Sequence, residues 1–384
     1  MNSIIIGLLE AGHQVKVLAV NSPKYNVKES DIPEDYRQKT GIELIDVDLD
    51  VKPMKAFFNL FTRRSYHVER FISKEFKARL AELLQKEQFD VVQLEMLYMA
   101  PYVETIREHS KAVIVLRAHN VEHKIWERIA KETKFFIKRW YINHLSKTLK
   151  EYELSALETV DGIAAITRKD AAFFRKYSSK PIIDIPYGVY PEEFTSKSEV
   201  EGKPKFYHIG SMNWMPNEEG IRWFIDEVLP KTVEKVPDFV YHLAGRNMPE
   251  WLTQLNNPNV DVIGEVPDAK AFVAENDVAI VPLLAGSGIR IKIIESMAMG
   301  KTVITTRVGA EGILYNEDVN LIIAENKAKM VEAIRSINAN PDIAVRIGQA
   351  ARKLVEESYD NRKIIARLLM FYEQIKSGSK ISFL

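Results

Sequence analysis

The chain has 384 residues, of which 46% are hydrophobic and 28% are charged, which is typical of a globular protein with room for two domains of ordinary size. Lysine plus arginine and aspartate plus glutamate both number 53, so no net field attracts nucleic acid. The lack of cysteine excludes disulfides and thiolate metal sites and favours a cytoplasmic setting, and no apolar run approaches the roughly 18 residues of a membrane helix.

The first elements depart from the usual order of a doubly wound domain. The sequence predicts an apolar helix over 3–9, a helix end at 10–13 and a strand over 14–20. A doubly wound domain normally begins with a strand and a tight glycine turn before such a helix. Because neither precedes this helix, we expect that the first N-terminal strand is missing.

The next stretch, over 42–49, alternates in the manner of a strand, with Val47 on the apolar side and Asp46 and Asp48 on the polar side. Asp46-Val47-Asp48 also fits the DxD pattern of some metal sites, but the alternation explains it as the polar face of a strand. A helix and two strands follow, over 65–88, 91–95 and 112–118.

The segment Arg117-Ala118-His119-Asn120-Val121-Glu122-His123 carries two competing interpretations. It contains the HxxEH pattern of zinc peptidases, which requires both histidines on one helix. Here His119 directly follows a buried strand and Asn120 fits a helix N-cap, so the pattern straddles a strand-to-helix turn and zinc is the weaker interpretation. Ligand groups are expected at such strand ends, so we expect His119 to face a ligand; the alternative is a hydrogen-bonded histidine with a structural role.

The helix predicted over 134–154 places large apolar side chains among many lysines. This pattern predicts a helix that faces the core or, alternatively, one that touches acidic lipid. After it, strands over 161–167 and 182–186 lead to the stretch Pro-Tyr-Gly-Val-Tyr-Pro, and the polar segment 195–205 fits a linker. A second domain then repeats the alternation, with strands over 206–210, 239–245, 260–266, 277–283, 302–306 and 321–324 and helices over 327–358 and 361–375.

The stretch over 277–312 predicts a βαβ unit with a glycine loop at the N-terminus of its helix. We expect Ile291, Ile294 and Ala298 on the buried face, with Gly300 just past the helix end. A helix N-terminus opened by glycines suits an anion, and Arg290 and Lys292 add two cations there. With Glu295 one turn deeper, the loop could hold a diphosphate and a ribose; the alternative is a solvated surface helix.

GSGIRIKIIESMAMGKTVITT over 286–306, followed by GAEG over 309–312, resembles the donor-binding segment of the family-4 retaining glycosyltransferases. The resemblance implies the GT-B fold, an α/β arrangement of two Rossmann-like domains facing across a cleft. It further implies an acceptor-side domain over 1–194 with the C-terminal helix 360–376, and a nucleotide-sugar-binding domain over 195–359.

The resemblance also implies roles for individual residues. His119, Arg290 and Lys292 would act in catalysis, with His119 near the reacting sugar and the cations on the diphosphate. The donor would be bound by Gly210, Ser211, Asn213, Arg246, Gly264, Val266, Ser287, Gly288, Ile289, Glu295 and Glu311. Ser287 stands where many members carry a second glutamate. The acceptor side would include Glu95, Asn120, Arg63 and Arg64.

The function implied is retaining transfer of a sugar from a nucleotide-diphosphate sugar to a glycan or lipid-linked acceptor in cell-surface polysaccharide synthesis. No cofactor or metal is expected, because cations neutralise the leaving diphosphate. A cytoplasmic enzyme, with peripheral contact at the inner membrane face and no nucleic acid partner, fits this function. The alternatives are a sugar-nucleotide epimerase on the same fold, a nucleotide-sugar binding protein without turnover, and the zinc peptidase.

Overall fold

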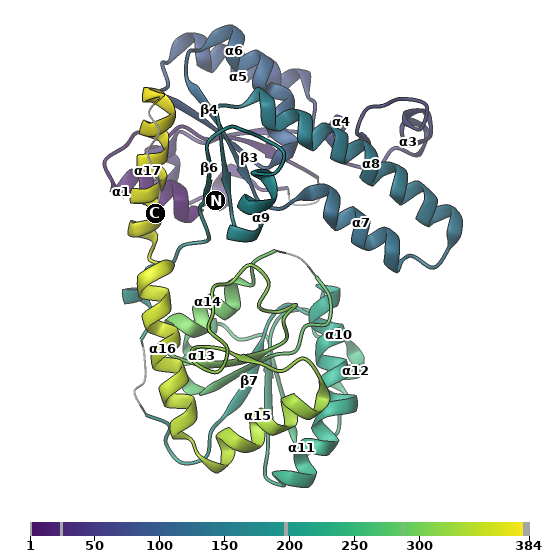
Figure 1. The fold of residues 1–384 in the computed structure, drawn as a ribbon, viewed down its shortest axis with the longest axis vertical. Coiled ribbons are helices and arrows are strands. Elements are labelled where there is room, and N and C mark those ends of the chain that lie inside the picture. Colours follow the sequence, from purple (N-terminus) through teal and green to yellow (C-terminus); the bar gives the residue numbers. More distant parts are fainter. Residues whose placement is uncertain (1, 24–25, 196–198, 287, 379–384) are drawn as a thin grey trace. The chain divides into compact units, whose positions relative to one another are not determined.

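The computed structural model describes residues 2–23, 26–195, 199–286 and 288–378. The chain divides into two compact units, unit 1 (Met1–Pro186 with Ile365–Leu384) and unit 2 (Tyr187–Ile364). Each unit is built from parallel strands flanked by helices, which confirms the predicted α/β class (Figure 1). We propose that these units are the two domains that the sequence predicts over 1–194 and 195–359.

Unit 1 contains two groups of parallel strands. The strands β1 (Leu18–Asn21) and β2 (Glu43–Asp46) form one pair, and the second group has the order β3-β4-β5-β6. The bounds of this second group are Val91–Glu95, Val113–Ala118, Gly162–Ala165 and Ile182–Asp184. Strand β4 reads Val-Ile-Val-Leu-Arg-Ala and is buried on both faces, as expected for an inner strand of a parallel sheet.

Helices cover the strands of unit 1, and two of them, α7 (Glu122–Glu132) and α8 (Phe136–Thr159), pack together as a long helical hairpin. The others are α1 (Asn2–Glu10), α2 (Glu34–Thr40), α3 (Pro53–Asn59), α4 (Tyr66–Glu69), α5 (Lys74–Lys86), α6 (Val103–His109) and α9 (Arg168–Phe174). The last helix, α17 (Asn361–Ser377), belongs to unit 1 from Ile365 onward. There Phe371 and Ile375 pack so tightly on Gly162 of β5 that a Cβ on that glycine would lie 2.3 Å from Ile375.

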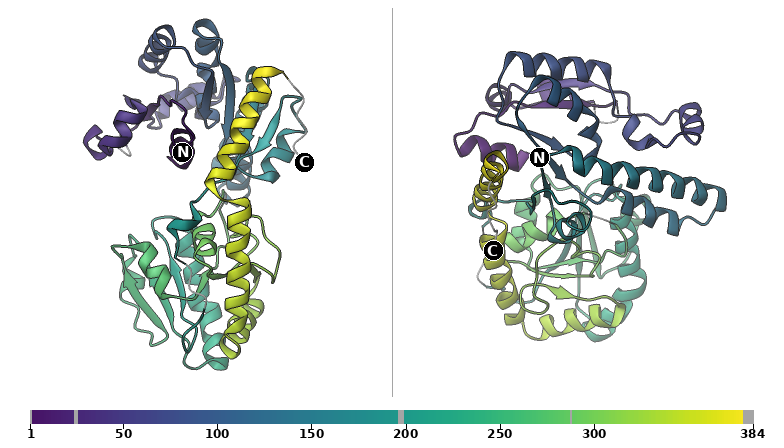
Figure 2. Two further views of the ribbon diagram at one scale, coloured as in Figure 1. Left: turned by 90° about the vertical axis from the view of Figure 1, so that its left-hand side faces the viewer. Right: turned by 45° about the horizontal axis from the view of Figure 1, so that its top comes forward.

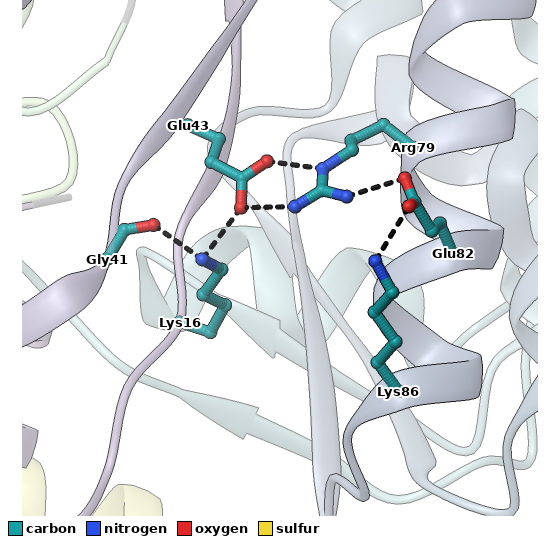
Figure 3. Close-up of polar contacts among 6 residues, drawn as sticks. All are labelled: Lys16, Gly41, Glu43, Arg79, Glu82 and Lys86. Carbon is teal, nitrogen blue, oxygen red and sulfur yellow. Dashed lines mark hydrogen bonds and ion pairs between the residues drawn. The ribbon is translucent and has the colours of Figure 1, made fainter.

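Side-chain ion pairs join the β1–β2 pair to α5 (Figure 3). Arg79 binds Glu43 of β2 through two nitrogens, at 2.5 and 2.9 Å, and Lys16 lies 2.7 Å from the same carboxylate. The hydrogen bond from Arg79 is the main reason that the pKa of Glu43 falls to about 2. Because α5 packs its apolar face on the core of the β3–β6 sheet, this cluster is an ionic link between the two groups of strands.

Unit 2 is one six-stranded parallel sheet with the order β12-β11-β10-β7-β8-β9. Its strands are β7 (Phe206–Ile209), β8 (Tyr241–Ala244), β9 (Val260–Gly264), β10 (Val278–Val281), β11 (Thr302–Thr305) and β12 (Ile322–Ile323). Counted from β7 as the first strand, this order is that of the classic doubly wound sheet. Successive residues of β10 alternate between two apolar clusters, Ile280 in one and Val281 in the other, so helices cover both faces.

The helices of unit 2 follow the strands in alternation, as the sequence predicts. They are α10 (Met215–Trp223), α11 (Leu229–Lys235), α12 (Glu250–Thr253), α13 (Ala269–Glu275), α14 (Ile291–Ala298), α15 (Lys327–Ala339) and α16 (Asp342–Ser358), with a π-helical turn at Phe224–Val228. Helix α14 ends as predicted, because Gly300 has a φ of 68° and the N–H of Lys301 bonds to the carbonyl of Ser296 at 2.9 Å.

Three local expectations are wrong. The single helix over 65–88 is two helices, because Ser73 caps α5 by accepting a hydrogen bond from the N–H of Phe76. Asn120 is not the N-cap of α7; that position is Val121, without a side-chain cap. Ile291 is 41% exposed because it opens α14, and the buried face is instead formed by Ile293, Ile294, Met297 and Ala298.

Candidate functional site

The strand order of unit 2 indicates where a ligand would bind. Neighbouring strands β7 and β10 connect to the rest of the sheet in opposite directions, so the loops after them diverge at a topological switch point. Ligands of open α/β sheets bind at this place, beyond the carboxyl ends of the strands. The predicted donor-binding residues that the structure describes lie at or after the carboxyl ends of β7, β8, β9, β10 and β11, at this same edge.

Three glycines bring the loops after β7, β8 and β9 into close contact. The N–H of Gly210 bonds to the carbonyl of Ala244 at 3.1 Å, and that of Gly245 to the carbonyl of Gly264 at 2.7 Å. A Cβ on Gly245 would lie 1.8 Å from the carbonyl oxygen of Gly210, and its φ is +150°. Any side chain at Gly245 would therefore separate two of the loops that form the site.

The loop before α14 has the backbone conformation that its glycines permit. Gly286 and Gly288 have φ values of 118° and 84°. Arg290, only 5% exposed, stands at the N-cap of α14 and donates to the carbonyl of Gly288. Its guanidinium lies 5.1 Å from the ring centre of Trp214, and a Cβ on Gly286 would press on both side chains. Gly286 therefore makes room for the side chains of Arg290 and Trp214.

Lys292 turns its ammonium toward the end of β7. Its Nζ lies 2.8 Å from Oδ1 of Asn217, 3.1 Å from Nε2 of His208 and 3.3 Å from the carbonyl oxygen of Ile209. Nδ1 of His208 lies 2.9 Å from the carbonyl of Ile280. A carbonyl only accepts, so we assign the proton of His208 to Nδ1, which leaves Nε2 to accept from Lys292.

The partners of this ammonium are all neutral, so no negative charge offsets the free-energy cost of burying it. Desolvation, assisted by the charge of Arg290, lowers the pKa of Lys292 to about 7. Desolvation and the charge of Lys292 hold the pKa of His208 well below its usual value, so the imidazole stays neutral. Gly210 is close as well, since a Cβ there would lie 2.8 Å from Nζ of Lys292. A bound anion would relieve this unfavourable charge.

Glu295 lies one turn after Lys292 on α14 and is partly buried. Burial raises the pKa of its carboxyl group, and the charge of Lys270 opposes that effect. Lys292, three residues before it, is engaged with Asn217 and His208, so α14 is not the solvated surface helix that the sequence left as the alternative. The carboxylate is therefore a hydrogen-bond acceptor at the edge where a ligand is expected.

The other predicted donor-side residues lie at the same edge with different surroundings. Arg246 is exposed and forms an ion pair with Glu265 at 3.2 Å. Ser211 donates to Asn213 at 2.8 Å. The remaining positions are Gly264, with φ +82°, Val266 after β9, Ile289 before α14 and Glu311 after β11. Ser287 lies outside the described residues.

In unit 1, Glu95 and His119 meet at the carboxyl ends of β3 and β4. Nε2 of His119 lies 2.6 Å from Glu95, and Arg117 lies 3.3 Å from the same oxygen. Burial raises the pKa of Glu95, but the hydrogen bond from His119 and the charge of Arg117 outweigh it and lower the pKa to about 2. Because an ionised carboxylate only accepts, Nε2 of His119 carries a proton and Nδ1 is left for a ligand.

The other carboxylate oxygen of Glu95 is held from α17 through Gln93. The amide of Gln93 donates to Glu95 at 2.7 Å, and the hydroxyl of Tyr372 donates to Gln93 at 2.5 Å. The last helix thereby fixes the carboxylate that orients His119.

The remaining residues of the HxxEH pattern are used structurally. His123 is fully buried and bonds through Nδ1 to Glu153, which also accepts from the N–H of Glu122 at 2.8 Å. The side chain of Glu122 accepts instead from Tyr98 at 2.9 Å, and burial raises its pKa. His119 stands before α7 and binds another carboxylate, so the pattern straddles the turn as expected. Among the described residues no group of three His, Cys, Asp or Glu side chains could hold a metal ion.

The other acceptor-side predictions are more scattered. Asn120 follows His119 directly and hydrogen-bonds to Glu122. Arg63 and Arg64 lie in the exposed segment between α3 and α4, where Arg64 is 3.7 Å from Glu69. The structure brings Glu95 and His119 together but shows no contact between them and these arginines.

Sequence reasoning missed three residues of the unit 2 site: His208, Asn217 and Trp214. One signal was available for His208, since a histidine within the otherwise apolar strand Phe-Tyr-His-Ile requires a polar partner. Nothing local points to Asn217, whose contact with Lys292 spans 75 residues of chain.

Residues 203–340 match the family described as "Glycosyl transferases group 1". An uncharacterized 44.6 kDa protein in the cps region of Klebsiella pneumoniae is 21% identical over 76% of both chains. A phosphatidyl-myo-inositol mannosyltransferase of Mycobacterium leprae is 26% identical over 52% of this chain and 55% of its own.

Solved structures of other proteins superpose on almost the whole of this chain. Sucrose-phosphate synthase from Thermosynechococcus elongatus superposes with a TM-score of 0.65 at 17% identity, over 97% of this chain and 92% of that one. HepE of Anabaena, in complex with UDP, gives a TM-score of 0.64 at 12% identity, over 94% and 100%. Such neighbours have the GT-B fold, as the sequence resemblance implies. Residues 203–340 therefore form a glycosyl transferases group 1 domain, and the chain is a glycosyltransferase with the GT-B fold.

Proposed function

We propose that this enzyme transfers a sugar, with retention of anomeric configuration, from a nucleotide-diphosphate sugar to a glycan or lipid-linked acceptor. The observation that carries the proposal is the convergence of Arg290 and Lys292 at the glycine-opened N-terminus of α14. Two cations beside a helix N-terminus, where the macrodipole is positive, can stabilise a leaving diphosphate.

Each requirement of such a transfer has a candidate group in this chain. The bond between the anomeric carbon and the diphosphate oxygen breaks while the acceptor oxygen bonds to that carbon from the same face. The negative charge that develops on the diphosphate is neutralised by Arg290, Lys292 and the backbone N–H groups beside Gly288. A donor phosphate oxygen takes the acceptor proton, so no metal and no second carboxylate are required.

The remaining site residues would position the two substrates. Glu295 would accept hydrogen bonds from the ribose hydroxyls, and His119 would bind a hydroxyl of the transferred sugar through the nitrogen that Glu95 leaves open. Glu95 is then a positioning residue. The loops at Gly210, Arg246 and Gly264 would surround the nucleoside.

The relatives support a role in cell-surface polysaccharide or glycolipid synthesis. The Klebsiella pneumoniae relative is a protein of a cps region, and the Mycobacterium leprae relative is named a mannosyltransferase. HepE has been seen with UDP and with UDP-glucose, so UDP-sugars are the first donors to test.

The test is a thermal-shift screen of nucleotide sugars against the full chain, followed by product analysis with the donor that stabilises it most. Transfer with a product anomer matching the donor, read by NMR, is the expected result. Conversion of the donor alone into an epimer would replace the proposal by a sugar-nucleotide epimerase. Donor binding without any turnover across glycan and lipid-linked acceptors would replace it by a binding protein.

A further inference from the structure

Exposed aromatic side chains of unit 1 are concentrated in two segments, residues 51–64 and 133–140. Of the seven exposed phenylalanine and tryptophan side chains among the described residues, six lie there, each 58–77% exposed. They are Phe57, Phe58, Phe61, Phe135, Phe136 and Trp140. Exposed aliphatic residues, Val51, Met54 and Ile137, accompany them. Single exposed apolar residues are normal on a protein surface, but a group of this size marks a place of contact.

The two segments belong to one surface of unit 1. Ala56 of α3 packs with Tyr66 of α4 and Leu145 of α8 in one small buried cluster. The backbone N–H of Lys52 also bonds to the hydroxyl of Tyr66 at 2.9 Å. Trp140 precedes Leu145 by five residues, or about 8 Å along the helix axis. Both α3 and the end of the α7–α8 hairpin project from the same side of unit 1 (Figures 1 and 2).

The charge of these segments is one-sided, although the whole chain is neutral. Residues 51–68 and 133–150 contain four and five lysines and arginines respectively, and no aspartate or glutamate. Neighbouring acids offset only part of this charge, through the ion pairs of Lys52 with Asp48 and of Arg64 with Glu69. We call residues 51–64 and 133–140 together the aromatic–basic surface.

We propose that the aromatic–basic surface docks this glycosyltransferase on a membrane that contains anionic lipid. Phenylalanine and tryptophan rings bury their apolar faces at the boundary between headgroups and acyl chains, while lysines and arginines remain on the lipid phosphates. Among the described residues, none of the helices has the length and apolar character of a membrane span.

Other occupants fit the surface less well. A second copy in a two-fold dimer would bring the same basic segments against each other, and like charges would repel. A nucleic acid would use the rings for stacking but gives no role to the exposed valine, methionine and isoleucine side chains, which favour hydrocarbon. The inference concerns a surface outside the proposed donor site and does not depend on the reaction.

The experiment is flotation of the full chain with vesicles, one set of phosphatidylglycerol and phosphatidylcholine in equal parts and one of phosphatidylcholine alone. Binding is expected only to the anionic set and should weaken with salt. Lys134→Ala with Lys138→Ala should weaken it roughly twentyfold to thirtyfold, because each cation near an anionic surface contributes about fivefold. A second double variant, Phe58→Ser with Phe136→Ser, should weaken binding to the anionic vesicles more strongly, by roughly tenfold for each ring that is removed.

Matched controls lie away from the surface. Met370→Ser changes an exposed apolar residue of α17, and Lys353→Ala changes an exposed lysine of α16. Both should bind anionic vesicles like the parent, and thermal unfolding should show that all variants are folded. The Phe58 and Phe136 positions are exposed, so their substitution should leave the unfolding temperature unchanged.

Four outcomes would overturn the proposal. One is equal binding to both vesicle sets, and another is equal loss in the controls and the surface variants. The third is a concentration-dependent dimer in solution that dissociates in Phe58→Ser, since the surface would then be an interface between copies. Absence of any vesicle binding by the parent at low salt would likewise reject membrane docking.

Discussion

The two groups of site residues differ in how their charges are balanced. In unit 2 the ammonium of Lys292 contacts an imidazole, an amide oxygen and a carbonyl oxygen, all neutral, and Arg290 lies over the ring of Trp214. In unit 1 both Arg117 and His119 contact the ionised Glu95. An unbalanced cation favours an anionic ligand, whereas a balanced pair favours neutral hydroxyl groups. This difference in charge balance is the physical basis for our proposal that the diphosphate binds in unit 2 and that the sugar hydroxyls contact unit 1.

The largest effect should come from removing the cations of unit 2. Lys292→Ala and Arg290→Ala should each weaken binding of the donor by about 1.5–3 kcal/mol, roughly tenfold to 150-fold, because each removes a charge-assisted contact to the diphosphate. Calorimetry with the donor measures this. Lys231→Ala, in an exposed pair with Glu234 on α11, is the matched control and should bind normally. Unchanged affinity in both site variants would reject the anion site.

Substitutions in unit 1 should lower turnover more than donor affinity, in contrast to those in unit 2. His119→Ala should lower turnover roughly tenfold by removing one hydrogen bond to the sugar, with donor affinity little changed. Glu95→Gln keeps the shape but removes the charge that orients His119, so it should show the same split in a weaker form. A matching loss of nucleotide affinity, or a folding defect in the circular dichroism spectrum, would show that His119 has a structural role instead.

Glu295→Gln tests the ribose contact and should have a smaller effect. The amide keeps one accepting oxygen, so the expected loss is about 1 kcal/mol, roughly fivefold. The loss should appear with nucleosides as well as with nucleotide sugars, because the partner is the ribose. A loss confined to ligands that contain phosphate would place Glu295 on the anion side and contradict the ribose contact.

The sequence alone could predict the features that depend on neighbouring residues. The glycine loop, the end of α14 at Gly300 and the strand end at His119 follow from local pattern and are confirmed. The contact between Lys292 and His208 joins positions 84 residues apart and depends on the order of the strands, which periodicity does not specify. Periodicity also fails to specify where a helix begins. Ile291 has the spacing of the apolar face, but its place at the start of α14 leaves it exposed.

A further predicted effect, which needs no substitution to appear, is a proton taken up when the donor binds, and it separates the two sites directly. In the free protein, burial lowers the pKa of Lys292 to about 7, so at pH 8 most of these side chains are neutral. A bound diphosphate stabilises the ammonium and raises this pKa, so binding above pH 7 must take up a proton. Glu95, with a pKa of about 2, stays ionised throughout and contributes nothing.

Donor affinity should accordingly be flat below about pH 7 and fall as the pH rises above it, by at most about tenfold per pH unit. The diphosphate of a nucleotide sugar is doubly esterified and does not itself titrate in this range, which makes it a clean probe. Calorimetry at pH 8 in buffers of different ionisation enthalpy should show uptake of up to one proton by the parent. Lys292→Ala removes the titrating group and should show none, while His119→Ala should match the parent. Equal uptake by the parent and Lys292→Ala would mean that the unbalanced charge of unit 2 lies on another group.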